Sequence, residues 1–68
     1  MNKDTVQGKA REMKGKIKQK WGQLTDDELT EIEGNAEILA GKLQVRYGVT
    51  REEAERQVKE FRRDNDWH

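Results

Sequence analysis

The sequence contains no cysteine, no proline and no serine, and its one histidine is the last residue, His68. Without cysteine the chain cannot form a disulfide or a thiolate metal site. Without serine or cysteine it lacks the nucleophiles most often used in acyl and phosphoryl transfer. We therefore expect a protein that is not an enzyme and that holds no cofactor and no metal ion.

Apolar residues are also scarce. Hydrophobic residues make up 31% of the 68 residues, whereas charged residues make up 41%. A chain this short with so few apolar groups is expected to form one domain, 1–68, with a stability on the order of 3–5 kcal/mol. No apolar run approaches the roughly 20 residues that cross a bilayer, and the first residues lack the apolar segment of a signal peptide. The expected location is the cytoplasm.

The chain does contain an apolar pattern that occurs twice. The first stripe consists of Val6, Ala10, Met13, Ile17 and Trp21. The second stripe, 26 residues later, consists of Ile32, Ala36, Leu39, Leu43 and Tyr47. Both have the spacing of one face of a helix. We predict an all-α fold of four short helices, over 4–21, 26–33, 35–47 and 51–64. The two pseudo-repeated α-hairpins correspond to repeat halves of about 3–29 and 29–64.

Start and stop signals support these boundaries. Gly22 and Gly48 each follow an aromatic residue that ends a stripe, where a left-handed glycine closes a helix. Thr25 with Glu28, and Thr50 with Glu53, have the spacing of a capping box, in which each side chain bonds the backbone N–H of the other residue. The break at 34–35 is the weakest, and the second and third helices could instead run together with a kink.

The predicted core extends both stripes. It comprises Val6, Ala10, Met13, Ile17, Trp21, Leu24, Leu29, Ile32, Ala36, Leu39, Leu43, Tyr47, Val49, Ala54, Val58 and Phe61. Ile38 and Val45 lie off the main stripe of the third helix. They give this helix either a second buried flank or a small exposed patch for a partner. We expect a monomer, with a weak dimer through Ile38 and Val45 as the alternative.

All glycines fall in two triplets with a spacing of seven: Gly8, Gly15, Gly22 and Gly34, Gly41, Gly48. A glycine inside a helix costs about 1 kcal/mol relative to alanine. Three explanations stay open: glycines tolerated on the surface, a face that another backbone approaches closely, or a fold that melts and re-forms easily.

Charge is distributed unevenly although the net charge is zero. Residues 1–22 carry a net charge of +5, residues 23–40 a net charge of −6, and residues 41–68 a net charge of +1. The basic first helix is therefore expected to attract the acidic second one. Asp26, Asp27 and Glu28 could suggest a cation site, but helix capping explains them better, because they lack the spacing of an EF-hand loop.

The basic helix holds the candidate functional residues. Lys9, Lys16 and Lys20 flank its apolar stripe on one side, and Arg11, Lys14 and Lys18 flank it on the other. Such residues form a solvated face, contact the phosphates of a nucleic acid or another anionic surface, or attach the helix to a membrane surface. We take Lys9, Lys16 and Lys20 as the candidate anion or nucleic-acid contacts.

Several short sequence motifs together are characteristic of a known family. They are Gly15-Lys16-Ile17-Lys18, the segment Trp21–Asp27 (WGQLTDD), Ile32-Glu33-Gly34 and the segment Gly41–Gly48 (GKLQVRYG). Over nearly its whole length the chain closely resembles the CsbD-like family of small bacterial proteins. The resemblance implies a compact bundle of two α-hairpins packed roughly orthogonally, and a role in the general stress response. It brings no catalytic or ligand residues to assign.

Two functions follow from these observations. The first is a non-enzymatic, small hydrophilic stress-response protein that is protective or chaperone-like. The alternative is a small nucleic-acid or anionic-surface binding module that uses the basic first helix. Salt-dependent binding separates them, because only the second function requires it.

Overall fold

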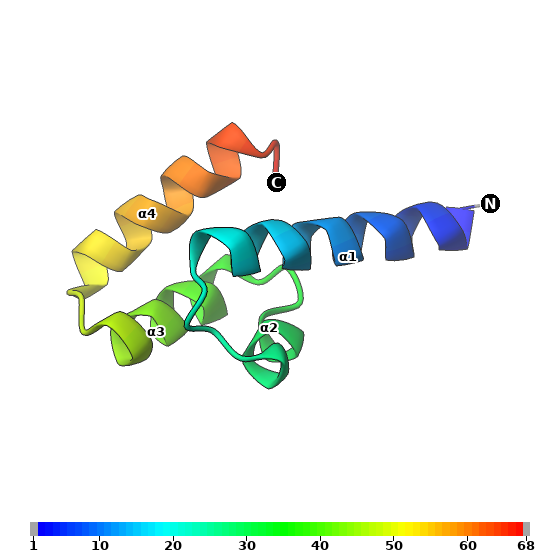
Figure 1. Cartoon of the computed structure of the whole chain (residues 1–68). Coiled ribbons are helices and arrows are strands. Elements are labelled where there is room, and N and C mark those ends of the chain that lie inside the picture. The colour runs from blue at the N-terminus through cyan, green and yellow to red at the C-terminus, as the bar shows by residue number, and fades with distance from the viewer. Residues whose placement is uncertain (1, 68) are drawn as a thin grey trace. The chain divides into compact units, whose positions relative to one another are not determined.

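The computed structural model describes the backbone of residues 2–67 and the side chains of residues 11–67, and Figure 1 shows its helices. The helices are α1 (Asn2–Lys20), α2 (Asp26–Ile32), α3 (Ala36–Tyr47) and α4 (Arg51–Asp64). Residues 2–67 contain no strand. The all-α prediction is confirmed, and each helix end lies within two residues of its predicted position.

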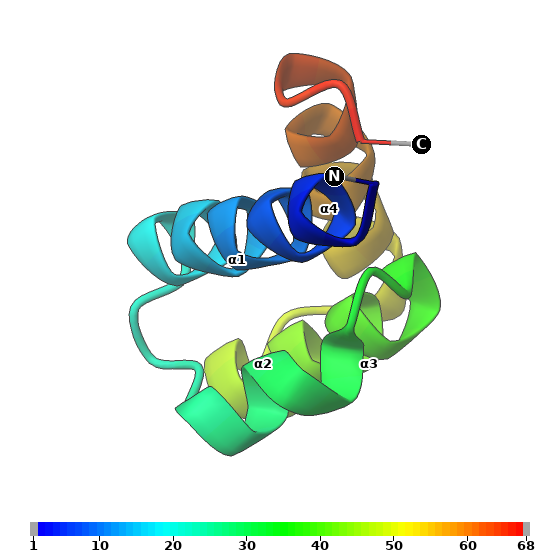
Figure 2. The same ribbon diagram turned by 90° about the vertical axis from the view of Figure 1, so that its right-hand side faces the viewer.

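The chain divides into two compact units, Met1–Gly34 and Asn35–His68. The first unit contains α1 and α2, which contact each other, and the second contains α3 and α4, which also contact each other. Figure 2 shows the same helices from a second direction. The single domain, and the roughly orthogonal packing of two repeated hairpins, stay predictions.

A few side chains hold the first unit together. Ile17, Trp21, Leu24, Leu29 and Ile32 are buried, and Met13 is half-buried. The predicted core residues Val6 and Ala10 lie outside the described side chains. The core of this unit therefore comes from the end of α1, the loop and α2, as the stripe predicts.

The second unit buries one face of α3 and one face of α4. The buried residues are Leu39, Ala40, Leu43, Ala54, Val58 and Phe61, and Ala36 and Val49 are half-buried. Ala40 is absent from the predicted core, although it lies one helical turn after Ala36. The apolar stripes of both helices thus face the unit's interior.

Three residues of α3 correct the sequence analysis. Tyr47 was predicted to be buried, but 37% of it is exposed. It is the last residue of α3, and the short connection that follows leads directly into the next helix, so the ring stays at the surface. Ile38 and Val45 are 38% and 80% exposed. The prediction of a second buried flank is wrong, because one face of α3 already supplies its part of the core.

The two glycines predicted to close helices behave differently. Gly48 is left-handed, with φ 65°, and its N–H donates to the carbonyl of Gln44 at 3.0 Å. Gly22 does not have a positive φ, so its prediction is wrong. The loop after α1 makes a turn instead, in which the Leu24 N–H donates to the carbonyl of Trp21 at 3.2 Å. Gly22 is the second residue of this turn. The commonest class of β-turn accepts most residue types at its second position, so glycine is not required there.

The break between α2 and α3 is a true helix end. Glu33 and Gly34 both have left-handed conformations, with φ 37° and 82°. The Asn35 side chain then accepts from the backbone N–H groups of Glu37 and Ile38, which caps the start of α3. The alternative of one kinked helix is therefore excluded by the backbone geometry.

The two threonine caps are not equivalent. Thr25 and Glu28 form the complete capping box: the Thr25 N–H donates to Glu28 Oε1 at 3.0 Å, and the Glu28 N–H donates to Thr25 Oγ1 at 3.2 Å. Thr50 accepts from the Glu53 N–H at 3.1 Å, but the Glu53 carboxylate accepts from Arg56 and Gln57 instead of returning to Thr50. The capping box predicted at Thr50 is therefore only half formed.

The neighbouring sequence explains this difference. Three residues after Glu53 stands Arg56, which donates to its carboxylate at 3.1 Å. Three residues after Glu28 stands Glu31, which cannot donate to a carboxylate. In this chain, the glutamate that has an arginine three residues ahead bonds to that arginine, and the other glutamate bonds back to its cap.

The end of α4 has a motif that the sequence analysis did not identify. Asp66 is left-handed, with φ 51°, and the Trp67 N–H donates to the carbonyl of Arg62 at 2.9 Å. The Trp67 ring then packs edge-on against Phe61, with ring centroids 5.9 Å apart. This is a Schellman ending with its usual apolar contact, and it extends the structured chain to Trp67.

Two helix-interior glycines yield a prediction about stability. A Cβ atom added to Gly15 or Gly41 would meet no atom within 4 Å. Gly15→Ala and Gly41→Ala should therefore each raise the free energy of unfolding by about 0.5–1 kcal/mol, because alanine loses less backbone entropy in a helix. Urea denaturation monitored by circular dichroism measures this change.

Gly48→Ala is the matched control. Its added Cβ is equally free of contacts, but the backbone there is left-handed. This substitution should lower the free energy of unfolding by about 1 kcal/mol. A loss of stability in Gly15→Ala or Gly41→Ala would contradict the interpretation that these glycines are merely tolerated at the surface.

Candidate functional site

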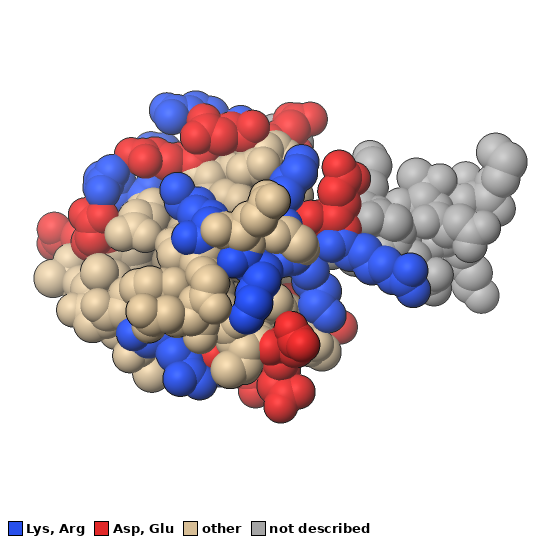
Figure 3. Space-filling view, viewed as in Figure 1, with Lys and Arg blue, Asp and Glu red and all other residues tan. Residues whose placement is uncertain are grey.

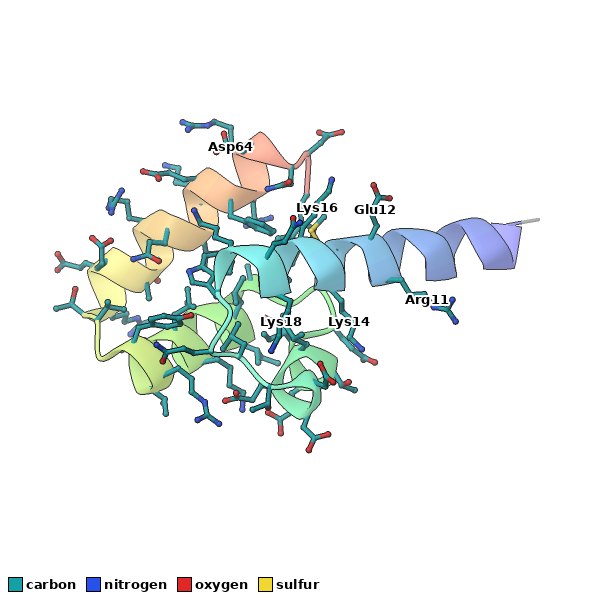
Figure 4. All side chains as sticks on the ribbon, viewed as in Figure 1. Arg11, Glu12, Lys14, Lys16, Lys18 and Asp64 are labelled. Carbon is teal, nitrogen blue, oxygen red and sulfur yellow. The ribbon has the colours of Figure 1, made fainter. Side chains whose placement is uncertain are left out.

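The labelled cations of α1 extend from two opposite sides of the helix (Figure 4). Arg11, Lys14 and Lys18 extend from one side, here called the loop-side row. Lys16 extends from the other side, together with Glu12. Lys20 follows Lys16 by one helical turn and belongs to the same side, here called the outer row. Figure 3 shows the basic side chains gathered over α1 and acidic side chains over α2.

The loop-side row helps to hold the first unit together. Lys18 Nζ donates to the carbonyl of Leu24 at 2.6 Å, and Lys14 Nζ donates to Thr30 Oγ1 at 3.3 Å. The Thr30 hydroxyl in turn donates to the carbonyl of Asp26 at 3.0 Å. Two of the three cations in this row thus bond the loop and α2, whereas Arg11 is exposed.

The outer row contains the predicted contacts. Lys16 forms an ion pair with Glu12, with Nζ and Oε1 3.8 Å apart. The Lys20 ammonium lies 5.5 Å from the centroid of the Trp21 ring. Lys9 lies outside the described side chains. Lys16 and Lys20 therefore share one side of α1, and each has a neighbour close to it in the sequence.

Three of the four acidic residues of α2 lie in its first turn. Asp26, Asp27 and Glu28 stand at the helix start, where negative charge is favourable. Glu28 is 9% exposed and is the only buried charged residue among the side chains described. Its carboxylate accepts from the N–H and the hydroxyl of Thr25. Within the described part of the chain, no three His, Cys, Asp or Glu residues are placed to hold a metal ion.

A second polar cluster lies on the surface of α4. Arg56 bonds Glu53 on one side and Glu60 on the other, and Gln57 also donates to Glu53. The hydrogen bonds from Arg56 and Gln57 hold the pKa of the Glu53 carboxyl below its usual value. These are exposed pairs three and four residues apart, and they support the helix that carries them.

The two clusters differ in what they can do chemically. Surface cations such as Arg11, Lys20 and the half-buried Lys16 can contact phosphate or carboxylate oxygens through charge, which salt screens. The residues that sequence reasoning did not single out are Thr30 and the carbonyl of Leu24, which bind the loop-side row. A carbonyl gives no sequence signal, and a lone threonine gives little.

None of the helices in the described chain combines the length and the apolar character needed to cross a bilayer.

Comparison with known proteins identifies the family. The model of the family described as CsbD-like matches residues 4–56. A UPF0337 protein of Bordetella pertussis is 61% identical over 61 residues, which cover 90% of this chain and 92% of that protein. The UPF0337 protein of Pseudomonas aeruginosa is 52% identical, over 90% of this chain and 94% of its own. UPF0337 protein YjbJ of Escherichia coli is 45% identical, over 98% of this chain and 97% of its own. The chain belongs to the CsbD-like family.

Proposed function

We propose that this chain is a non-enzymatic, hydrophilic protein of the bacterial stress response that acts in the cytoplasm and shields other macromolecules. The stress role comes from the family resemblance, and the shielding role comes from the surface. Charged residues make up 41% of the chain at zero net charge. Such a surface binds water strongly and has no net field that would draw in one kind of charged partner.

The main support for the proposal is that many polar side chains form hydrogen bonds within the protein's own helices and loop. Thr25, Asn35 and Thr50 cap α2, α3 and α4. Lys14 and Lys18 bond the loop and α2, and Arg56 bonds residues of its own helix. The polar groups therefore maintain two small helical units, which is the arrangement expected of a hydrated, protective surface.

Protection of a heat-labile enzyme tests the proposal. Light scattering of a dehydrogenase at its aggregation temperature should fall when the chain is added in molar excess. An equal mass of an inert protein of similar size serves as the reference. Gly15→Ala/Gly41→Ala, which has the same charge, should protect equally well if the folded surface acts. Scattering equal to that of the inert reference would contradict the proposal.

The second candidate is a nucleic-acid or anionic-surface module, and the outer row of α1 favours it. Lys16 and Lys20 stand one turn apart on one side of the helix, and Lys9 lies two turns before Lys16. Against this function, six acidic residues and no base occupy 23–40, directly after the basic helix. Their negative charge offsets the field of the basic helix, and the chain has no net positive charge to attract phosphate, so we expect weak binding.

A charge-neutralised variant distinguishes the two candidates. If α1 binds nucleic acid, Lys9→Gln, Lys16→Gln and Lys20→Gln together should weaken binding to all sequences. The slope of log affinity against log salt should flatten by about 2–3. Fluorescence anisotropy with a labelled duplex at several salt concentrations measures both. The control replaces Arg51, Lys59 and Arg63 by glutamine, which changes the net charge equally. Tight, salt-sensitive binding that only the α1 variant loses would favour the second candidate.

A further inference from the structure

The outer face of α3 carries two apolar side chains that the unit does not bury. Ile38 is 38% exposed and Val45 is 80% exposed. They are seven residues apart, so they lie two turns apart on one side of the helix. Gly41 lies between them, and a Cβ added there would meet no atom within 4 Å. The opposite side of α3 is buried through Leu39, Ala40 and Leu43.

We propose that two copies of this chain associate weakly through the outer face of α3, with the two α3 helices parallel. β-Branched residues at the a positions of a heptad are compatible with two parallel helices, and Ile38 and Val45 are seven residues apart, so they can occupy two successive a positions. Gly41 has no side chain to hold the helices apart, so the two backbones can approach closely between the apolar layers. This inference does not depend on the proposed function.

The charges beside this face select the parallel orientation. In a parallel pair, a residue just before one apolar layer faces the residue five positions later on the other helix. Glu37 stands immediately before Ile38, and five positions later stands Lys42. The two-fold symmetry makes this Glu37–Lys42 pairing twice. In an antiparallel pair that sets Ile38 of one copy against Val45 of the other, Lys42 of each copy would lie beside Lys42 of the other, and like charges repel.

The small size of the face makes the association weak. Stable interfaces bury at least about 1,200 Å² in total, which two apolar side chains per copy cannot supply. We therefore expect a dissociation constant on the order of 1 mM. The protein is then a monomer in dilute solution and pairs only when it is concentrated.

Single-cysteine variants test both the contact and its orientation, because the natural chain has no cysteine. Ile38→Cys and Val45→Cys should each form a disulfide-linked homodimer at about 1 mM protein under mild oxidation, because a parallel pair brings identical positions within disulfide distance. Glu55→Cys, at an exposed position of α4, is the control for random collision. Mass spectrometry of a mixture of Ile38→Cys and Val45→Cys should show mainly homodimers.

Two outcomes would overturn the proposal. Predominance of the mixed disulfide would establish an antiparallel pair. Cross-linking no faster than that of Glu55→Cys would show that copies do not meet at this face. Circular dichroism of each variant before oxidation confirms that it is folded.

Charge reversal provides an independent check in the Val45→Cys background. Glu37→Lys or Lys42→Glu alone should slow cross-linking at least about threefold, because each replaces two attractions by two repulsions. The double variant Glu37→Lys/Lys42→Glu should restore the rate. Equal rates in all these variants would contradict the proposed pairing of charges.

Discussion

Leu43→Ala should leave most of the protein unfolded at 37 °C. Leu43 is fully buried in the core of the second unit. Truncation of a buried leucine to alanine costs about 2–5 kcal/mol, because the removed methyl groups leave a cavity. A chain of this size has only about 3–5 kcal/mol of stability to lose. Thermal unfolding followed by circular dichroism should show a large loss of helix at temperatures at which the natural protein is folded.

Val45→Ala is the matched control, two residues further along the same helix. Val45 is 80% exposed, so at low protein concentration its truncation should change the free energy of unfolding by no more than about 0.5 kcal/mol. Similar losses in Leu43→Ala and Val45→Ala would contradict the assignment of buried and exposed faces of α3.

Thr25→Ala should destabilise the protein by about 2 kcal/mol, and Thr50→Ala by about 1 kcal/mol. Both variants lose the hydroxyl that caps a helix start. Thr25→Ala also removes a hydroxyl that donates to the carboxylate of Glu28, at 3.2 Å, and so leaves a buried charge with one partner fewer. Urea denaturation of both variants measures the difference.

Serine variants separate the hydroxyl from the methyl group at these positions. Thr25→Ser and Thr50→Ser keep the capping hydroxyl and should retain most of the stability. Equal losses in Thr25→Ala and Thr50→Ala would mean that the bond from the Thr25 hydroxyl to the Glu28 carboxylate adds nothing to the simple cap.

Helix boundaries could be predicted from the sequence because the signals that set them are local. Thr25, Asn35 and Thr50 each cap with their own side chain, and the bonds reach only two or three residues ahead. The conformation of Gly22 and the half-formed box at Thr50 could not be predicted from the repeat alone. Both depend on differences between the two halves. The loop after α1 is longer than the loop after α3, and Arg56 stands where the first half has Glu31.

Burial was harder to predict, because it depends on which faces of a helix find a neighbour. The stripe placed Leu39 and Leu43 correctly, but it also placed Tyr47 in the core. Apolar character could not decide between the buried and the exposed interpretation of Ile38 and Val45. The pattern likewise gave no indication of Trp67, whose ring reaches Phe61 only because Asp66 takes a left-handed conformation.

The candidate cations show the same limit. Sequence spacing assigned them to two rows, and Figure 4 shows Lys16 on the side of α1 opposite to Arg11, Lys14 and Lys18. It could not reveal that Lys18 donates to the carbonyl of Leu24, because a backbone acceptor in a loop is not encoded by any residue type. The outer row stays the candidate for anion contacts, and the loop-side row has a structural role in the first unit.

The two tryptophans give the protein one fluorescent reporter in each unit. Trp21 is 3% exposed in the first unit, and Trp67 lies against Phe61 in the second. Each indole also has a cation near its ring, Lys20 at 5.5 Å and Arg62 at 5.7 Å. Emission from Trp21→Phe and Trp67→Phe would therefore follow the second and the first unit separately. Coincident unfolding curves would mean that the two units lose their structure as one cooperative body, and separate curves would mean that each half folds and melts by itself.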